Sequence, residues 1–290
     1  MSIERVFVIG AGLMGHGIAQ VSAAAGKRVT LADRTAELAE QGAARIGANL
    51  RRLVEKGKLD PPSASSIIDR ISTAEGADRA AGHDIVIEAI FEDEALKRQT
   101  WEALSRTADA EAILASNTSS ISITALATST DRPQKFIGLH FFSPVPVMGL
   151  IEIIRGLETD DATHEAAREF ARELGKTVIE SKDMPGFLVN RMLGPFINEA
   201  IFTLMESTGT AEDIDTGAKL GLNHPMGPLE LCDFIGNDVM LNVMEVLYRG
   251  FGDPKFRAAP LLRQLVAAGH LGRKTGRGFY RYDERGTRVS

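Results

Sequence analysis

The sequence is poor in cysteine and has no long hydrophobic run. Its 290 residues include one cysteine, Cys232, so no disulfide can form within the chain, which is consistent with a reducing compartment. No segment reaches the roughly 18 consecutive apolar residues of a membrane-spanning helix. Residues 1–5 lead directly into an apolar run and leave no room for a signal peptide. We therefore expect a cytoplasmic protein with no membrane partner.

Excess positive charge and clustered histidines are also lacking. The net charge of −6 argues against nucleic acid as the main partner. The six histidines are scattered at spacings that make no metal-binding motif, so we predict no metal site. The chain has 44% hydrophobic and 25% charged residues, which is typical of a globular protein, and its length is comfortable for two domains.

An apolar strand and a glycine turn lie close to the N-terminus. Residues 6–9 run into Gly10, Gly12 and Gly15, which have the G-x-G-x-x-G spacing of dinucleotide-binding proteins. Gly10 allows a tight turn, Gly12 leaves room for a pyrophosphate, and Gly15 lets the next helix pack against the strand. The N-terminus of that helix favours an anion. The alternative is an ordinary strand-helix-strand unit in which the glycines serve only the turn.

An acidic residue follows the second predicted strand. Residues 28–32 form that strand, and Asp33 comes eighteen residues after Gly15. A carboxylate there accepts hydrogen bonds from the ribose hydroxyls of adenosine and repels a 2′-phosphate, so it favours NAD over NADP. The neighbouring Arg34 could accommodate that phosphate, which leaves NADP as the alternative.

Short apolar runs alternate with helical stretches through the first half of the chain. The runs are residues 6–9, 28–32, 84–89, 112–115 and 136–139. This pattern predicts a doubly wound, mostly parallel sheet with helices on both faces. After residues 183–186 only helical periodicity remains, with Asp183 as a candidate cap and Pro185 in the first turn of a helix. We predict an α/β fold with a Rossmann-type domain over residues 1–184 and an all-helical domain over residues 185–290.

Polar residues stand at the ends of these runs, where ligands bind in open α/β sheets. Residues 116–120 read Ser-Asn-Thr-Ser-Ser, His140 follows the next run, and Glu152 interrupts an apolar stretch. A buried carboxylate needs a partner, and a pair with His140 would orient the imidazole and raise its basicity for acid–base chemistry. The alternative is that Glu152 faces solvent from an edge strand or pairs with Arg155, and that His140 is a core histidine with its hydrogen bonds satisfied.

Two further features have both a functional and a structural interpretation. Asn190 shares a helical stripe with Phe187 and Gly194, where its amide can bind a substrate oxygen or another helix. A predicted helix after the second strand carries a basic cluster that suits an anionic ligand or forms a solvated face. The cluster comprises Arg45, Arg51, Arg52, Lys56 and Lys58.

Taken together, these motifs resemble the 3-hydroxyacyl-CoA dehydrogenase family. The resemblance rests on GAGLMG, SNTSS, HFFSPVPV, PGFLVNR and HPMGPLEL, with Glu152 between the third and fourth, and it covers nearly the whole chain. It is strongest to the short monofunctional 3-hydroxybutyryl-CoA dehydrogenases. It implies an NAD-binding Rossmann domain, a helical domain for substrate binding and homodimerisation, and a CoA thioester as substrate.

The resemblance also implies roles for individual residues. His140 and Glu152 are the implied catalytic pair, and Ser119 and Asn190 the implied contacts of the reacting oxygen atoms. The implied cofactor contacts are Gly10, Gly12, Gly15, Asp33, Glu92, Lys97, Ser119, Ser143 and Lys274. Lys56 is an implied CoA contact, and Asn49 replaces a serine that contacts CoA in some relatives. Ser143 stands where the family usually has Asn, and its shorter side chain predicts looser or water-bridged binding on the nicotinamide side.

The implied reaction is the NAD-dependent oxidation of an (S)-3-hydroxyacyl-CoA to a 3-oxoacyl-CoA, and its reverse. His140 acts as general base or acid while Glu152 stabilises the imidazolium. One alternative is a dehydrogenase of a free hydroxy acid or sugar acid of the gulonate type, and another is a noncatalytic NAD-binding structural protein. The basic helix and the two phenylalanines after His140 favour a thioester, and the His140–Glu152 combination argues against a purely structural role.

Overall fold

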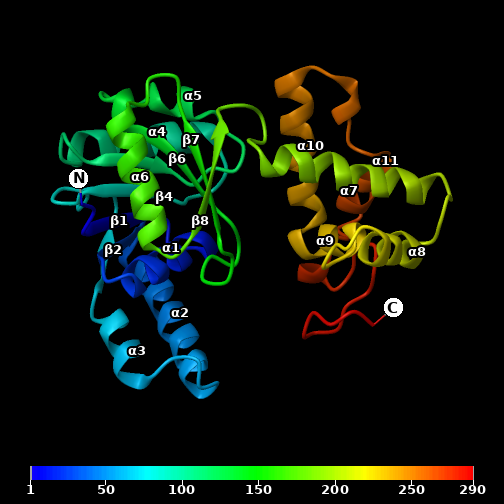
Figure 1. The fold of residues 1–290 in the computed structure, drawn as a ribbon, viewed down its shortest axis with the longest axis horizontal. Helices are drawn as coiled ribbons and strands as arrows, with labels where there is room; N and C mark the ends of the chain where they lie inside the picture. The colour runs from blue at the N-terminus through cyan, green and yellow to red at the C-terminus, as the bar shows by residue number, and fades with distance from the viewer. Residues whose placement is uncertain (1, 290) are drawn as a thin grey trace. The chain divides into compact units, whose positions relative to one another are not determined.

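An eight-stranded sheet has the strand order β3-β2-β1-β4-β5-β6-β7-β8 (Figure 1). Neighbouring strands are parallel except for β6 and β7, which are antiparallel. The strands are β1 (Arg5–Ile9), β2 (Arg28–Asp33), β3 (Ile71–Glu75), β4 (Ile85–Glu88), β5 (Ile113–Ser116), β6 (Phe136–Phe141), β7 (Leu150–Arg155) and β8 (Thr177–Lys182). This sheet confirms the predicted doubly wound α/β fold.

Burial explains which strands are visible in the sequence. Every residue of β4 and β5 is buried, so both strands read as apolar runs. The strands β3 and β8 lie at the two edges of the sheet and contain exposed residues. Neither is among the predicted strands, because an edge strand with a solvated face has no continuous apolar run.

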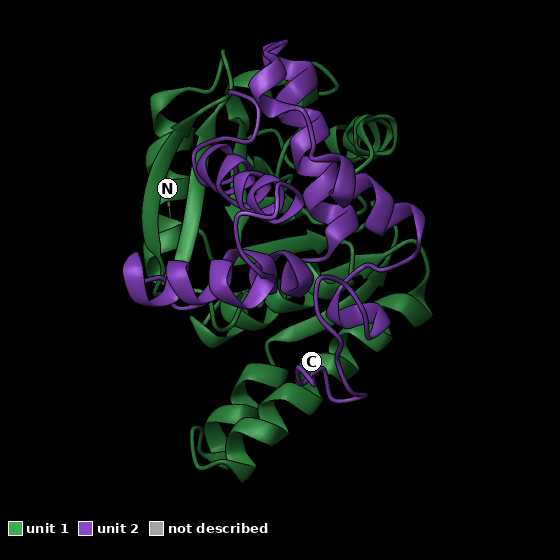
Figure 2. Ribbon diagram, turned by 90° about the vertical axis from the view of Figure 1, so that its right-hand side faces the viewer, with its two compact units in different colours: residues 1–183 green, residues 184–290 purple. Residues whose placement is uncertain are grey.

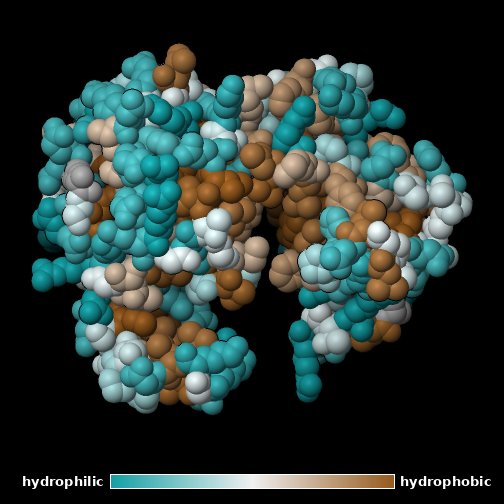
Figure 3. Space-filling view, in the orientation of Figure 1, coloured by the Kyte–Doolittle hydropathy of each residue, from teal (hydrophilic) through white to brown (hydrophobic). Residues whose placement is uncertain are grey.

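Helices cover both faces of the sheet. On one face, Val8, Ile18, Ile46 and Ala167 belong to one core that joins β1 to α1, α2 and α6. On the other face, Trp101 of α4 meets Phe136 of β6 edge to face. The outward surface of α6 is hydrophilic (Figure 3). The helices are α1 (Leu13–Ala24), α2 (Ala36–Glu55), α3 (Pro61–Ile68), α4 (Glu94–Thr107), α5 (Ile123–Ala127) and α6 (Asp161–Glu173), with the 3₁₀ helix η1 (Pro133–Lys135).

The structure is a computed structural model that describes residues 2–289, and it divides after Asp183 into two compact units (Figure 2). The second unit is built from α7 (Val189–Met205), α8 (Ala211–Thr216), η2 (Gly217–Gly221), α9 (Pro228–Ile235), α10 (Asn237–Phe251), η3 (Pro254–Phe256), α11 (Pro260–Ala267) and η4 (Arg273–Thr275). Cys232 lies in its hydrophobic core with Leu229 and Met244. Strand-like pairing in the described part of this unit is limited to isolated β-bridges.

The first helix of the second unit begins later than predicted. The helix α7 starts at Val189, with Leu188 as its N-cap residue, whereas Pro185 lies in a turn. Phe187 has a φ of +49° and precedes the helix, so it does not share a helical stripe with Asn190. The local sequence favours a helix start at the proline, but the positive φ at Phe187 interrupts the helical path.

Asp183 does not cap that helix either. Its carboxylate accepts hydrogen bonds from Ser122 Oγ at 2.8 Å and from the backbone N–H groups of Ile123 at 3.0 Å and Thr124 at 2.8 Å. It therefore binds the N-terminal end of α5, about sixty residues earlier in the chain. The prediction was wrong because the position of Asp183 just before a helix does not reveal that residues 122–124 lie within hydrogen-bonding distance of its carboxylate.

Within residues 2–289, none of the helices combines the length and apolar character needed to cross a bilayer.

Candidate active site

The glycine turn is tightly packed on its protein side and open at its centre. Gly10 has a φ of +99°, and a Cβ there would lie 2.5 Å from the carbonyl oxygen of Ala89. A Cβ at Gly15 would lie 1.6 Å from the carbonyl oxygen of Gly10, whereas one at Gly12 would meet nothing within 4 Å. No described side chain caps the N-terminus of α1. Its backbone N–H groups are therefore suited to a pyrophosphate.

Asp33 ends β2 beside this turn. Its Oδ2 accepts a hydrogen bond from the backbone N–H of Ala11 at 2.7 Å, and its Oδ1 accepts one from that of Arg34 at 2.7 Å. The carboxylate is thus held next to the glycine turn, at the carboxyl end of a parallel strand where a dinucleotide ribose binds. The uncapped helix, the open Gly12 and the anchored carboxylate together fit NAD.

Glu92 holds the loop that follows β5. Its Oε1 accepts hydrogen bonds from Thr118 Oγ1 at 2.6 Å, from the N–H and Oγ of Ser119 at 2.8 and 3.1 Å, and from Ser120 Oγ at 3.1 Å. Lys97 Nζ, on α4, lies 3.3 Å from its Oε2. Burial acts to raise the pKa of Glu92, but Lys97 and these hydrogen bonds outweigh it and hold that pKa below its ordinary value. The structure therefore brings Glu92, Lys97 and Ser119 together.

His140 and Glu152 face each other across β6 and β7. The antiparallel register places them directly opposite, with Nδ1 2.8 Å from Oε2. The residue His140 is 6% exposed and Glu152 is fully buried. Arg155 pairs with Asp161 rather than with Glu152. The two structural alternatives for Glu152, a solvent-facing carboxylate and a pair with Arg155, are therefore wrong.

Two polar residues near these groups have contacts that the sequence did not indicate. Glu88 is the last residue of β4, and its Oε1 lies 2.5 Å from Lys97 Nζ. Asn117 follows β5, and its Oδ1 accepts the backbone N–H of Phe141 at 2.9 Å. Each stands at the end of an apolar run, so their positions alone made them candidates.

The basic cluster lies on an exposed surface of α2. Arg45 and Arg52 are on the helix, and Lys56 is its C-cap residue. All three are exposed, and none forms an ion pair with another described residue. Asn49 of the same helix donates a long hydrogen bond, 3.4 Å, to Gln20 of α1. The structure thus leaves cations available to an anionic ligand here.

The remaining predicted site residues lie on loops and in the second unit. Ser143 is exposed in the loop after β6 and precedes a cis proline. Asn190 is the second residue of α7 and is half-buried. Lys274 lies in η4, and its Nζ donates to both carboxylate oxygens of Asp238 at 2.6 and 2.7 Å. Lys274 therefore has an anionic partner within its own unit.

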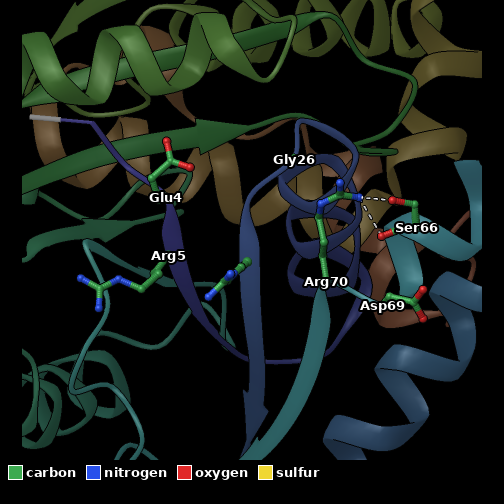
Figure 4. Close-up of a pocket in the computed structure, with 7 residues that line it drawn as sticks. Glu4, Arg5, Gly26, Ser66, Asp69 and Arg70 are labelled. Atoms are coloured by element: carbon green, nitrogen blue, oxygen red, sulfur yellow. Dashed lines mark hydrogen bonds between the residues drawn. The ribbon is translucent and has the colours of Figure 1, made fainter.

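A cavity of about 680 Å³ lies away from these residues, at the amino ends of the first strands (Figure 4). Arg5 and Arg28, which begin β1 and β2, line it with Arg70, whose guanidinium donates to Ser66. Ligands of open α/β sheets bind at the opposite, carboxyl ends of the strands. We therefore regard this cavity as separate from the candidate active site.

Two family models match the chain along its two units. Residues 5–184 match the NAD-binding domain of 3-hydroxyacyl-CoA dehydrogenase, and residues 186–282 match the C-terminal domain of that enzyme. The chain belongs to the 3-hydroxyacyl-CoA dehydrogenase family. This dehydrogenase is an oxidoreductase whose cofactor is NAD, as the motifs predict.

The similarity to individual members extends over both units. The dehydrogenase is 53% identical over 280 residues to 3-hydroxybutyryl-CoA dehydrogenase of Bradyrhizobium diazoefficiens, covering 97% of this chain and 96% of that protein. It is 41% identical over 287 residues to the mitochondrial hydroxyacyl-coenzyme A dehydrogenase of Rattus norvegicus, covering 97% and 91%. The crystal structure of (S)-3-hydroxybutyryl-CoA dehydrogenase from Ralstonia eutropha superposes with a TM-score of 0.95 at 50% identity, covering 98% and 100%.

Proposed function

We propose that this dehydrogenase interconverts (S)-3-hydroxybutyryl-CoA and acetoacetyl-CoA, with His140 as the general base and acid. The observation that carries the proposal is the buried His140–Glu152 pair at the carboxyl end of β6. The choice of substrate is supported by relatives at 53% and 50% identity that are named for this thioester.

The hydrogen bond to Glu152 prepares His140 to accept a proton. When the neutral imidazole donates its Nδ1–H to the carboxylate, Nε2 presents a lone pair. In the oxidative direction Nε2 takes the proton of the substrate 3-hydroxyl. The chemistry that NAD would supply when bound is acceptance of the C3 hydride. Glu152 then stabilises the imidazolium, which returns its proton to the C3 oxygen in the reverse reaction.

Other side chains bind the substrate and the cofactor. Ser119 and Asn190 hold the C3 oxygen and the thioester carbonyl in this proposal, and Lys56 binds a CoA phosphate with Asn49 beside it on α2. The unpaired, exposed ammonium of Lys56 supports that role. The proposed cofactor contacts are Gly10, Gly12, Gly15, Asp33, Glu92, Lys97, Ser119, Ser143 and Lys274.

We assign residues 1–184 to NAD binding and residues 185–290 to substrate binding and homodimerisation. Exposed apolar side chains in the second unit support an interface there, with Leu220 83%, Leu222 63% and Met192 62% exposed. NAD and CoA thioesters are metabolites of the cell interior, which supports a cytoplasmic location.

The test is NADH oxidation by the purified protein with acetoacetyl-CoA, beside parallel reactions with free acetoacetate and with NADPH. The proposal expects turnover only with NADH and the thioester. His140→Gln is expected to lower kcat by about 10²- to 10⁴-fold with little change in the Kd for NADH. Turnover of the free acid would assign a hydroxy-acid dehydrogenase instead, and a wild-type kcat in His140→Gln would rule out the general base.

A further inference from the structure

Glu88 is a fully buried carboxylate that the proposed reaction does not use. Its two oxygens have separate partners. Oε1 accepts hydrogen bonds from Lys97 Nζ at 2.5 Å and from the backbone N–H of Ile90 at 2.9 Å, and Oε2 accepts one from Ser116 Oγ at 2.8 Å. One side chain at the end of β4 therefore contacts both α4 and the end of β5.

The first connection from Glu88 to Ser119 runs through a buried ammonium. Lys97 is 1% exposed and lies between Glu88 and Glu92, whose oxygens are 2.5 and 3.3 Å from Nζ. Glu92 accepts both the backbone N–H and the hydroxyl of Ser119. Because Lys97 separates two carboxylates, its charge keeps Glu92 ionised and able to accept these hydrogen bonds.

The second connection runs along the start of the loop. Ser116 Oγ donates to Glu88 and accepts the backbone N–H of Thr118 at 3.2 Å. The backbone N–H of Asn117 donates to the carbonyl oxygen of Glu88 at 2.8 Å. Residues 116–118, which immediately precede Ser119, are thus fixed to the end of β4.

We propose that Glu88 is a positioning residue for the dehydrogenase reaction, fixing Ser119 through Lys97 and Glu92 on one side and through Ser116 on the other. The inference rests on the proposed role of Ser119. Buried ion pairs seldom stabilise a fold more than apolar groups of the same size, because desolvation offsets the attraction. Since α4 already packs through the buried side chains of Trp101 and Leu104, the ion pair is suited to holding the loop rather than the helix.

The test is the double variant Glu88→Gln with Lys97→Met, which removes both charges of the buried ion pair and leaves Glu92 without its ammonium partner. We expect it to fold, and to show faster amide hydrogen exchange at residues 117–121 than the wild type. We also expect kcat with acetoacetyl-CoA to fall by about tenfold, the factor for one lost hydrogen bond.

The charged groups facing Glu92 are Lys97 and, beyond it, Glu88. Because Lys97 lowers the pKa of Glu92, removing both charges is expected to raise that pKa. The acid limb of the plot of kcat against pH should then move to higher pH.

Ser116→Ala is a second variant that changes no charge. It cuts only the second connection, so we expect faster exchange at the Thr118 amide and an unchanged acid limb. The matched control is Lys27→Met, since Lys27 is also a buried ammonium and pairs with Glu173 at 2.7 Å near the amino end of β2. The control is expected to lower Tm and to leave exchange at residues 117–121 and the pH profile unchanged.

Wild-type exchange at residues 117–121 and a wild-type acid limb in the folded double variant would overturn the proposal. Unchanged exchange would overturn it even if kcat fell and the Kd for NADH rose, because the proposed cofactor contact of Lys97 alone accounts for those two changes. The exchange measurement needs no turnover. If the wild type did not reduce acetoacetyl-CoA, the proposed function would fail while exchange would still decide whether Glu88 holds the loop.

Discussion

Glu152→Gln isolates the charge of the catalytic pair from its shape. Glu152 is fully buried, and its Oε2 lies 2.8 Å from His140 Nδ1. An amide has the same size and can still accept the Nδ1–H, so the imidazole can keep its place. What the variant loses is the negative charge that stabilises the imidazolium after His140 has taken the substrate proton.

The distance between the His140 imidazole and the Glu152 carboxylate sets the expected fall in kcat. Two unit charges about 4 Å apart attract by about 4 kcal/mol at an effective dielectric constant of about 20, which gives an upper value for the buried pair. A hydrogen bond to a charged group contributes about 1.5 kcal/mol at the low end of its range. At about 1.4 kcal/mol for each factor of ten, kcat should fall by about 10- to 10³-fold in Glu152→Gln.

The assay is the initial rate of NADH oxidation at saturating acetoacetyl-CoA, with Tm measured to show that the variant is folded. Glu180→Gln is the matched control, because Glu180 lies 3.4 Å from the imidazole of His164 in a pair that joins β8 to α6 outside the candidate site. We expect the control to keep the wild-type kcat. An unchanged kcat in folded Glu152→Gln would refute the reasoning, since the carboxylate charge would then have no part in the reaction.

Three further predictions follow from the described contacts. Lys56→Ala should raise the KM for the CoA thioester and leave the Kd for NADH unchanged, because an exposed phosphate contact contributes to binding rather than chemistry. The control is Lys58→Ala, which changes a neighbouring exposed lysine. An unchanged KM in Lys56→Ala would show that the basic cluster is only a solvated face of the helix. Asp33→Ala should weaken NADH binding and reduce the preference over NADPH in a fluorescence titration, whereas an unchanged preference would remove Asp33 from cofactor selection. The folded-state pKa of Glu92 lies below its ordinary value of 4.5, so its contribution to stability is complete above that pH and is lost as the pH falls through the lowered pKa. Urea unfolding of the wild type and of Glu92→Gln across this range should show the stability difference shrinking toward acid pH, and a constant difference would contradict the assignment.

The sequence is most informative about the fold where burial is complete. The run Ile85–Glu88 is buried at every position, and its apolar character alone predicts a central strand. Ile71–Glu75 forms an edge strand with several exposed residues, so neither a run nor a clear alternation of apolar residues marks it. Pro185 and Phe187 show a further limit, because a helix start depends on backbone angles that residue types only favour.

The candidate site is predictable where one general rule applies. Ser119 follows β5, and Asp33 and His140 lie at the carboxyl ends of β2 and β6, the edge at which ligands bind in such sheets. The cost of burying a carboxylate also predicts that Glu152 needs a partner. The links from Glu88 through Lys97 to Glu92 were not predictable in this way, because they require α4 to fold back over the end of β4.

The pairing of β6 with β7 also bears on how this enzyme can change during evolution. His140 stands opposite Glu152 because the backbone ladder aligns the strands, with Leu139 opposite Ile153 and Phe141 opposite Ile151. One residue lost within β7 would bring an isoleucine opposite His140. The catalytic pair can therefore persist through substitutions at the neighbouring positions of β7, whereas a change in the length of that strand would separate the two side chains.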